Sequence, residues 1–303
     1  MLNTTDLQKE ILKLKKEKGV CILAHAYMTH DIIEIADYVG DSFGLSKQAK
    51  EAPEKTIIMC GVRFMAETVK ILSPEKTIIL SHPEAGCPMA EQLEVDELKR
   101  LKKDLPNATV IAYVNTTAAL KCECDMCVTS ASAVELVKNL ENDEILFIPD
   151  PNLGSFVKKA VPNKKYHFIN GGCPVHMGIS YEDVAYAKSK HPNAKLLIHP
   201  ECKKEVTACA DYVGSTTGIM GYVKNSEENE FIIGTENSIV EHLKFEYPDK
   251  KFYPLSKKCV CSDMKLTTLV DVYNCLLGIG GEEILLDADT LKGARKCIDN
   301  MLK

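Results

Sequence analysis

Short apolar segments alternate with longer amphipathic segments along most of the chain. The apolar segments are rich in Ile, Val and Leu and stay apolar at consecutive positions, which is typical of parallel strands covered on both faces. The amphipathic segments are long enough for the helices that cross over between parallel strands. The pattern therefore predicts an α/β fold with short parallel sheets. The predicted strands are residues 20–24, 56–60, 77–80, 109–113, 144–149, 165–169, 195–199, 230–234 and 251–254.

These strands form three similar units. Their first strands end at His25, Tyr113 and His199, so the units repeat at steps of 88 and 86 residues. Units of this length are the size of small domains and are too long for solenoid repeats. We expect a pseudo-threefold axis to relate them around one central site. The predicted helices of the first unit lie near 30–38, 62–72 and 94–104.

Two loop-forming Pro-Asn pairs, after Leu105 and His191, mark the boundaries between the units. The N-terminal segment spaces Leu and Ile among lysines, which predicts an amphipathic helix. The predicted division is an N-terminal helix at 1–19, α/β units at 20–105 and 106–191, and a third unit with C-terminal helices at 192–303.

Composition and charge argue against several classes of protein. The 303 residues carry a formal net charge of -6 with mixed signs, so no basic surface indicates nucleic acid as a partner. The longest apolar runs are strand-length, so we expect no membrane span, and the N-terminus lacks the apolar core of a signal peptide. Thirteen cysteines without an export signal favour a reducing compartment, and we expect a cytoplasmic protein.

Polar side chains stand at the carboxyl ends of several predicted strands. His25, Tyr113 and His199 end first strands, and Asp150 and Glu236 follow second strands. A polar residue in this position can simply mark the protein surface. Because α/β sheets bind ligands at the carboxyl ends of strands, and because the pattern recurs in every unit, we interpret these residues as parts of a site.

A hydroxyl side chain follows each first-strand end after 17 residues, as Ser42, Ser130 and Thr216. Each precedes an amphipathic segment, so we expect it to cap the N-terminus of a helix. The free N–H groups and the dipole of such a terminus also bind anions. The chain has only three arginines, so helix ends and hydroxyls are the candidates for binding three anionic groups near the axis.

A cysteine recurs with the same period, at Cys87, at Cys173, and then at Cys259 or Cys261. Zinc sites usually draw ligands from local Cys-x₂-Cys pairs, so one cysteine per unit is unusual for zinc. Three thiolates from three loops suit an iron–sulfur cubane, which usually takes four cysteines. The missing fourth ligand would leave one iron open as a Lewis acid.

The densest cysteine group lies elsewhere, at Cys122, Cys124 and Cys127. This spacing could bind a metal or exchange thiols, but it has no fourth ligand nearby. We expect Cys275 and Cys297, on apolar helix faces, to act as small hydrophobic residues.

An ordered set of motifs resembles the quinolinate synthase (NadA) family. Each motif alone is weak, but together they run in order through all three units, from about residue 20 to residue 270. The motifs are Ile22-Leu-Ala-His-Ala-Tyr27, Gly40-Asp-Ser42, Phe64-Met-Ala-Glu-Thr68, Cys87-Pro, Tyr113-Val-Asn-Thr-Thr117, Thr129-Ser130, Pro149-Asp-x-Asn-Leu-Gly154, Cys173-x-Val-His176, His199-Pro-Glu-Cys202, Gly214-Ser-Thr216, Gly234-Thr-Glu236 and Cys261-x₂-Met-Lys265.

The resemblance implies three-layer α/β/α domains related by the pseudo-threefold axis around a central active site. It implies a transferase that condenses iminoaspartate with dihydroxyacetone phosphate to quinolinate, releasing phosphate and water, in de novo NAD biosynthesis. It also implies a [4Fe-4S] cluster with one open iron acting as Lewis acid. In this family two residues and a methionine follow the third cysteine, so the implied ligands are Cys87, Cys173 and Cys261. The implied partners are the two small-molecule substrates, with the enzyme that supplies iminoaspartate as a candidate functional contact.

The strand-end positions and the resemblance converge on one site. We expect Tyr27 and Glu201 to transfer protons. Glu201 is the expected general base, because burial beside a dianionic substrate would raise its pKa. The expected catalytic residues are Tyr27, Glu201, His25, His199 and Tyr113, and the expected substrate-binding residues are His25, Ser42, Tyr113, Asn115, Ser130, His199, Glu201 and Thr216.

Three features depart from the family pattern, and none is a cluster ligand. Pro151 stands where the family commonly has Arg or Lys, so a charge expected there is missing. Ala26 stands where a larger residue is frequent, and the cysteine-rich stretch at 122–127 is not part of the shared pattern.

Two other functions compete with this interpretation. A redox sensor would need an effector module such as a basic DNA-binding helix, and none is visible in the sequence. An aconitase-like hydro-lyase also uses an open iron, but it would not need a phosphate-sized anion site. An assay with and without dihydroxyacetone phosphate separates the synthase from the hydro-lyase.

Overall fold

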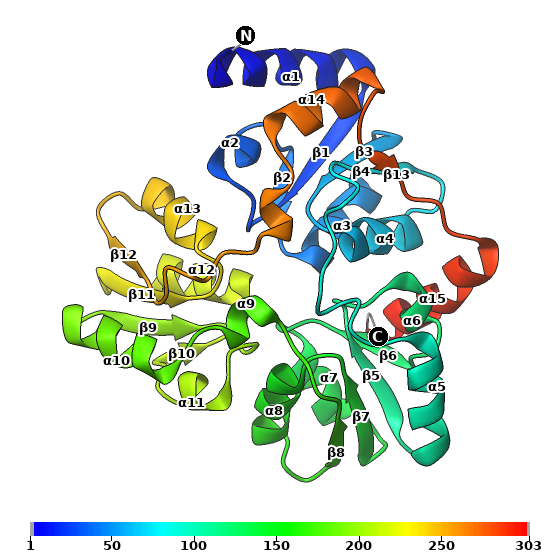
Figure 1. The fold of residues 1–303 in the computed structure, drawn as a ribbon, viewed down its shortest axis with the longest axis vertical. Helices are drawn as coiled ribbons and strands as arrows, with labels where there is room; N and C mark the ends of the chain where they lie inside the picture. Colours follow the sequence, from blue (N-terminus) through cyan, green and yellow to red (C-terminus); the bar gives the residue numbers. More distant parts are fainter. Residues whose placement is uncertain (1–2, 302–303) are drawn as a thin grey trace.

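The computed structural model describes residues 3–301, and Figure 1 shows three α/β units arranged around a common centre. Each unit has its own sheet of parallel strands flanked by helices. The predicted fold class, three α/β/α domains with short parallel sheets, is confirmed. None of the helices in the described range combines the length and apolar character needed to cross a bilayer.

Helices and strands alternate through the three units. In the first part of the chain they are α1 (Thr4–Lys18), β1 (Val20–His25), α2 (His30–Ile33), β2 (Tyr38–Gly40), α3 (Ser42–Glu51), β3 (Thr56–Cys60), α4 (Arg63–Leu72), β4 (Thr77–Leu80) and α5 (Val95–Asp104). The second sheet brings β5 (Thr109–Tyr113), α6 (Ala118–Lys121), β6 (Met126–Val128), α7 (Ala133–Asn139), β7 (Glu144–Ile148), α8 (Pro151–Ala160), β8 (Lys165–Phe168), α9 (Pro174–Met177) and α10 (Tyr181–Lys190). The third brings β9 (Lys195–Ile198), α11 (Lys204–Thr207), β10 (Tyr212–Val213), α12 (Thr216–Asn225), β11 (Glu230–Gly234), α13 (Ser238–Glu246) and β12 (Lys251–Pro254).

The three sheets share one strand order. It runs β2-β1-β3-β4 in the first sheet, β6-β5-β7-β8 in the second and β10-β9-β11-β12 in the third. All of these pairings are parallel, and the middle strands are buried almost throughout. The identical order supports the predicted threefold repeat. The predicted unit boundaries at 19, 105 and 191 stay a prediction.

Each sheet has a fourth strand that the sequence pattern did not predict, namely β2, β6 or β10. The helix predicted at 30–38 was too long, because α2 ends at Ile33 and β2 begins at Tyr38. The physical reason is a tertiary contact at Asp37. Its backbone N–H donates to the Ile22 carbonyl and its carboxylate accepts the Ile22 N–H, each at 2.8 Å, which draws the chain back onto β1.

The Asp37 contact recurs in all three units. Asp125 accepts the Val110 N–H and Asp211 accepts the Leu196 N–H, again at 2.8 Å. A buried or partly buried lysine recurs in the same way and donates to backbone carbonyls where a helix ends. Cations at this position satisfy free carbonyl groups and the negative end of the helix dipole. The pairs are Lys76 with Ala49 and Ala52 after α3, Lys164 with Leu140 and Asn142 after α7, and Lys250 with Val223 and Ser226 after α12.

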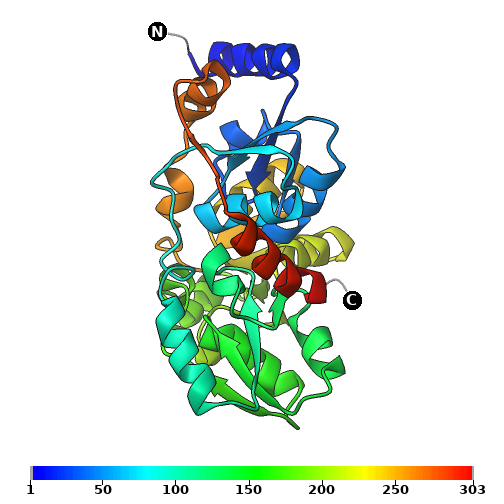
Figure 2. The same ribbon diagram turned by 90° about the vertical axis from the view of Figure 1, so that its right-hand side faces the viewer.

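The end of the chain packs against the first two sheets. It comprises a short 3₁₀ turn (Asp263–Lys265), α14 (Leu269–Leu277), β13 (Glu282–Glu283) and α15 (Ala288–Met301). Helix α14 lies beside α1, and β13 adds an antiparallel strand to β4. Helix α15, red in Figure 2, covers the second sheet with Ala294, Cys297 and Ile298 in its core. This segment therefore joins the first unit to the second.

Replacing Lys76 with Met should destabilise the protein by about 1.5–3 kcal/mol, the usual effect of losing hydrogen bonds to a charged group. The Lys76 ammonium is buried, and its removal leaves the Ala49 and Ala52 carbonyls without this donor. Urea unfolding measures the change. Lys55→Met, at an exposed position nearby, is the control and should have little effect. Equal stability of the two variants would contradict a role for Lys76 in anchoring α3.

Candidate functional site

One cavity lies where the carboxyl ends of the three sheets meet, and it encloses about 150 Å³. This is room for a small molecule, since a single water needs only about 10–15 Å³ of cavity volume on this measure. The structure places all the expected catalytic, substrate-binding and cysteine residues on the wall of this cavity; of the two further strand-end carboxylates, Glu236 lines it and Asp150 does not. The expected catalytic, substrate-binding and cysteine residues are His25, Tyr27, Ser42, Cys87, Tyr113, Asn115, Ser130, Cys173, His199, Glu201, Thr216 and Cys261.

The first strand of each unit delivers a polar side chain to the cavity. Strands β1 and β5 end at His25 and Tyr113, and His199 directly follows β9. The two histidines make equivalent local contacts. His25 Nδ1 accepts the Tyr27 N–H at 3.1 Å, and His199 Nδ1 accepts the Glu201 N–H at 3.4 Å. The chain turn after the strand therefore fixes both imidazole rings.

The three predicted cap residues line the cavity, but the capping assignment was wrong. Ser42 and Thr216 are the first residues of α3 and α12, and Ser130 lies ahead of α7. The residues at the cap positions are Asp41, Ser132 and Ser215, and the side chains of Asp41 and Ser215 accept the N–H groups of Gly44 and Gly218. Because the neighbouring residues occupy the cap positions, the Ser42 hydroxyl is available to the cavity, and the Thr216 hydroxyl is within hydrogen-bond distance of the Tyr27 hydroxyl on the cavity wall.

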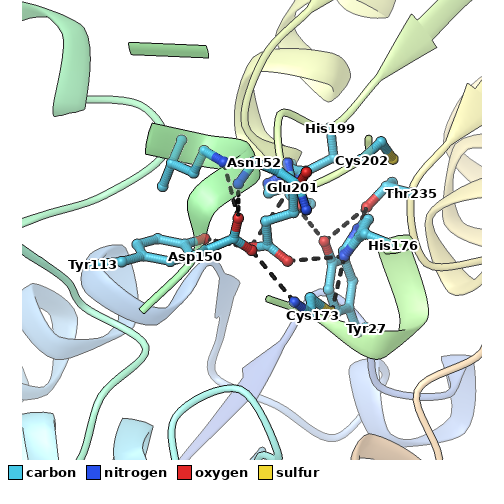
Figure 3. A network of polar contacts seen from close by, with 12 residues as sticks. Tyr27, Tyr113, Asp150, Asn152, Cys173, His176, His199, Glu201, Cys202 and Thr235 are labelled. Carbon is cyan, nitrogen blue, oxygen red and sulfur yellow. Dashed lines mark hydrogen bonds and ion pairs between the residues drawn. The ribbon is translucent and has the colours of Figure 1, made fainter. Parts of the chain in front are cut away.

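A buried chain of hydrogen bonds crosses the cavity wall and joins all three units (Figure 3). The Tyr113 hydroxyl donates to Glu201 Oε1 at 2.7 Å, and Glu201 Oε2 lies 2.9 Å from His176 Nδ1. His176 Nε2 lies 2.9 Å from Thr235 Oγ1, and Thr235 Oγ1 lies 2.8 Å from the Tyr27 hydroxyl. The Tyr27 hydroxyl also lies 2.8 Å from Thr216 Oγ1. Residues far apart in sequence are thus joined in one chain of hydrogen bonds.

Sequence reasoning gave no role to two members of this chain, His176 and Thr235. Both occur in the family motifs, and Thr235 directly follows β11 at the carboxyl edge of the third sheet. Thr235 is fully buried and does not line the cavity. Its position at the end of a strand could have marked it as a site residue. Its partners Tyr27 and His176 come from other units, so the sequence alone did not reveal the contacts.

Several neighbours set the pKa of Glu201. Burial alone would raise it, but attraction to His176 and His199 when these are protonated, together with hydrogen bonds from His176 and Tyr113, outweighs burial and lowers the pKa in the free protein. The expected rise assumed a bound dianionic substrate, so it stays a prediction. Burial and the nearby Glu201 charge raise the pKa values of Tyr27 and Tyr113 well above normal, so both hydroxyls stay protonated. The site holds a carboxylate beside protonated phenols.

Burial keeps two cavity histidines neutral. It lowers the pKa of His25 and of His199 to about 4, against an ordinary value of 6.5. A neutral imidazole can donate one hydrogen bond and accept another. These rings can therefore orient a substrate without adding charge to the cavity.

The three predicted cysteine ligands share two features. Each lies in the same cavity, and the second and third residues after it donate backbone N–H groups to its sulfur. Burial raises the pKa of the Cys87 thiol to about 12, and these N–H groups act in the opposite direction because they favour the thiolate. Cys259 does not line the cavity, which agrees with the choice of Cys261. The donors are Met89 and Ala90 to Cys87, Val175 and His176 to Cys173, and Asp263 and Met264 to Cys261.

These surroundings fit an iron–sulfur cluster. Thiolates are the usual ligands of such clusters, and bound metal deprotonates a coordinating thiol. The Cys173 sulfur also lies within 4.8 Å of a ring nitrogen of His176 and a carboxylate oxygen of Glu201, so these three side chains could together bind a metal ion.

The cysteine-rich stretch at Cys122–Cys127 lies outside the cavity lining. It packs against α15, where the sulfur of Cys127 is 3.1 Å from the sulfur of Cys297. The structure thus separates this group from the candidate active site.

Comparison with known proteins agrees with this geometry. The sequence pattern of the family described as "Quinolinate synthetase A protein" (NadA) matches residues 9–303. The chain belongs to the quinolinate synthase family. A quinolinate synthase of Caldicellulosiruptor bescii is 46% identical over 302 residues, covering 100% of this chain and 99% of that protein. One from Clostridioides difficile is 45% identical over 298 residues, covering 98% of both chains. "Quinolinate synthase 2" of Methanosarcina acetivorans is 47% identical over 296 residues, covering 98% of this chain and 95% of that one.

The stability of this quinolinate synthase family member should fall as pH decreases from about 6.5 to about 4. His25 and His199 stay neutral in the folded chain down to about pH 4, whereas the unfolded chain takes up their protons near pH 6.5. The unfolded chain therefore binds more protons in this window, and folding weakens by on the order of 3 kcal/mol per histidine. Urea unfolding of the iron-free chain across this range measures the slope. His199→Asn should make the slope shallower, and an unchanged slope would contradict the neutral state of His199.

Proposed function

We propose that this enzyme condenses iminoaspartate with dihydroxyacetone phosphate to quinolinate, releasing phosphate and water, in de novo NAD biosynthesis. The proposal depends most on one observation. Three cysteines, one from each repeat, line the same cavity as the buried chain of hydrogen bonds from Tyr113 to Tyr27. Family membership supports the same reaction class, a carbon–carbon bond-forming transferase.

Cys87, Cys173 and Cys261 are the residues that would hold a [4Fe-4S] cluster. When bound, the cluster would supply a Lewis acid at the iron without a protein ligand. The backbone N–H groups at each sulfur stabilise the thiolates that such ligation needs.

Hydroxyls and helix N-termini are the groups that would bind the anionic parts of the substrates. Ser42 and Thr216 begin α3 and α12, where free backbone N–H groups and the helix dipole favour negative charge. The arginines are engaged elsewhere. Arg63 binds Glu282, Arg100 binds the Asp96 carbonyl, and Arg295 binds Asp299. Ser130 completes the set of hydroxyls, and Asn115 adds an amide.

The buried chain of hydrogen bonds provides general acid–base chemistry. Tyr27 Oη donates its proton to the reacting substrate, and Thr235 Oγ1 passes a replacement proton from His176 Nε2. The Glu201 carboxylate, held at Oε1 by Tyr113, stabilises positive charge on His176. In the reverse direction the same chain removes a proton from substrate. His25 and His199 remain neutral and orient the substrate.

A cytoplasmic location is part of the proposal. All thirteen cysteines are free thiols in the structure, in keeping with a reducing compartment. The enzyme that supplies iminoaspartate is the proposed functional partner, because an enzyme of this activity needs that substrate.

Replacing Cys87, Cys173 or Cys261 with Ser should abolish both iron retention and quinolinate formation, because each supplies one of the proposed thiolates. Iron per chain after anaerobic purification is the measurement. Cys124→Ser and Cys259→Ser are the matched controls and should keep most of the iron. Iron loss in Cys259→Ser together with full iron in Cys261→Ser would refute the ligand assignment.

Thr235→Val should slow turnover at least about 100-fold while iron stays bound, because it interrupts proton transfer between His176 and Tyr27. Tyr27→Phe and Glu201→Gln should behave alike. Quinolinate formation is measured with and without dihydroxyacetone phosphate, which also tests the requirement for that substrate.

The control is Thr267→Val, which removes another buried hydroxyl, hydrogen-bonded to Ser81 Oγ at 2.7 Å and outside the cavity lining. It should leave turnover near normal. Normal turnover in Thr235→Val would remove this residue from the proton route. Equal loss in both threonine variants would show that a buried hydroxyl matters only for stability.

A further inference from the structure

We propose that Asp150 and Glu236 are positioning residues that hold the loops of two cysteines, Cys173 and Cys261, at the geometry a cluster requires. This inference rests on the proposed function, since it concerns the same cluster. It assigns a task to two buried carboxylates that take no part in the proposed proton route. Both are fully buried and stand two residues beyond the third strand of their unit in chain order, Asp150 after β7 and Glu236 after β11.

Asp150 uses both carboxylate oxygens as hydrogen-bond acceptors. Oδ1 accepts the N–H groups of Asn152 and Leu153 at 2.8 and 2.9 Å, at the start of α8. Oδ2 accepts the N–H of Cys173 at 3.4 Å. The side chain therefore links the sheet edge and the helix to the cysteine loop.

Glu236 repeats this arrangement 86 residues later. Its Oε2 accepts the Ser238 N–H at 2.8 Å at the start of α13. Its Oε1 accepts the Cys261 N–H at 3.4 Å and lies 3.2 Å from Lys265 Nζ. Two equivalent carboxylates thus bind the backbone of two equivalent cysteines.

In the first unit a different carboxylate binds the backbone of the cysteine. The equivalent position there is Val62, and the Cys87 N–H donates instead to Glu91 Oε1 at 3.0 Å. The adjacent Gln92 accepts the Gly172 N–H at 3.0 Å. Gln92 also donates to the Pro149 carbonyl at 2.6 Å, so it joins the first cysteine loop to the second. All three cysteine backbones are therefore held by a carboxylate.

The close approach of the second cysteine loop depends on glycine. Gly171 and Gly172 have φ values of +138° and +122°, which side-chain-bearing residues rarely adopt. A Cβ on Gly172 would lie 2.9 Å from Met177 Sδ and 3.5 Å from Asp150 Oδ2. The loop is thus built to pass closely over Asp150.

The double use of each carboxylate makes a near-isosteric test available. An amide has one acceptor oxygen, so Asn at 150 or Gln at 236 cannot accept at both of its partners. In either variant the amide NH₂ group would face a backbone N–H at one of the two contacts, and two donors cannot form a hydrogen bond with each other. Groups that orient metal ligands typically change metal affinity 10–100-fold when altered.

Asp150→Asn and Glu236→Gln proteins are loaded with iron and sulfide anaerobically, and the rate of iron transfer to a chelator is measured. We expect iron release at least about 10-fold faster than from the unsubstituted protein. We also expect an altered visible circular dichroism spectrum of the freshly loaded cluster, which a general loss of stability would not change.

Asp125→Asn and Asp211→Asn are the matched controls, because these carboxylates bind strand N–H groups in the same two units and not the backbone of a proposed ligand cysteine. They should leave release rate and spectrum unchanged. Release at the unsubstituted rate from both test variants, or equal acceleration in the controls, overturns the proposal. If Asp150→Asn fails to fold, Glu236→Gln decides alone. Full iron in Cys173→Ser and Cys261→Ser would instead overturn the cluster itself, which keeps the two failures distinct.

Discussion

The buried carboxylate of Glu201 is the group on which the site depends most. A charge removed from water must be paired and hydrogen-bonded, or it costs several kcal/mol. Glu201 follows the first strand of the third sheet, yet it binds Tyr113 at the end of β5 and His176 in α9. Glu201 is therefore paired only when the end of β9, the end of β5 and helix α9 lie together at the cavity. The same contacts keep Glu201 ionised. His176 in turn contacts Thr235, and Thr235 contacts Tyr27.

The threefold repeat of one α/β unit explains how this site forms from common helices, strands and loops. Each unit places a polar residue at the end of its first strand and binds that strand with an aspartate. A lysine binds the end of a helix, at the same relative position in each unit, and a cysteine loop follows at a closely similar one. The threefold arrangement turns one cysteine per unit into three thiols around a single cavity. The tail formed by β13 and α15 then ties the first two units together.

The sequence predicted the features that depend on local pattern. Apolar strands such as 56–60 and 109–113 were predicted with their observed bounds, and the threefold repeat correctly placed the expected catalytic, substrate-binding and cysteine residues around one cavity. The features that depend on distant partners were missed or wrong. Strand β2 forms because Asp37 binds Ile22, and the sign of the Glu201 pKa shift depends on His176, which lies in another unit. The caps differ by one or two residues from the prediction, because α3 and α12 already begin at Ser42 and Thr216 and are capped by the preceding Asp41 and Ser215, whereas α7 begins only after Ser132.

The central claim is that three cysteines from three repeats hold one cluster with an iron open to substrate beside the acid–base chain. Mössbauer spectroscopy of anaerobically loaded protein, with and without dihydroxyacetone phosphate and an unreactive iminoaspartate analogue, tests it most directly. The account predicts about four irons per chain, as in a cubane, and a change confined to one of them when the ligands bind. A cluster of another size, or a spectrum in which no single iron responds to the ligands, would contradict it.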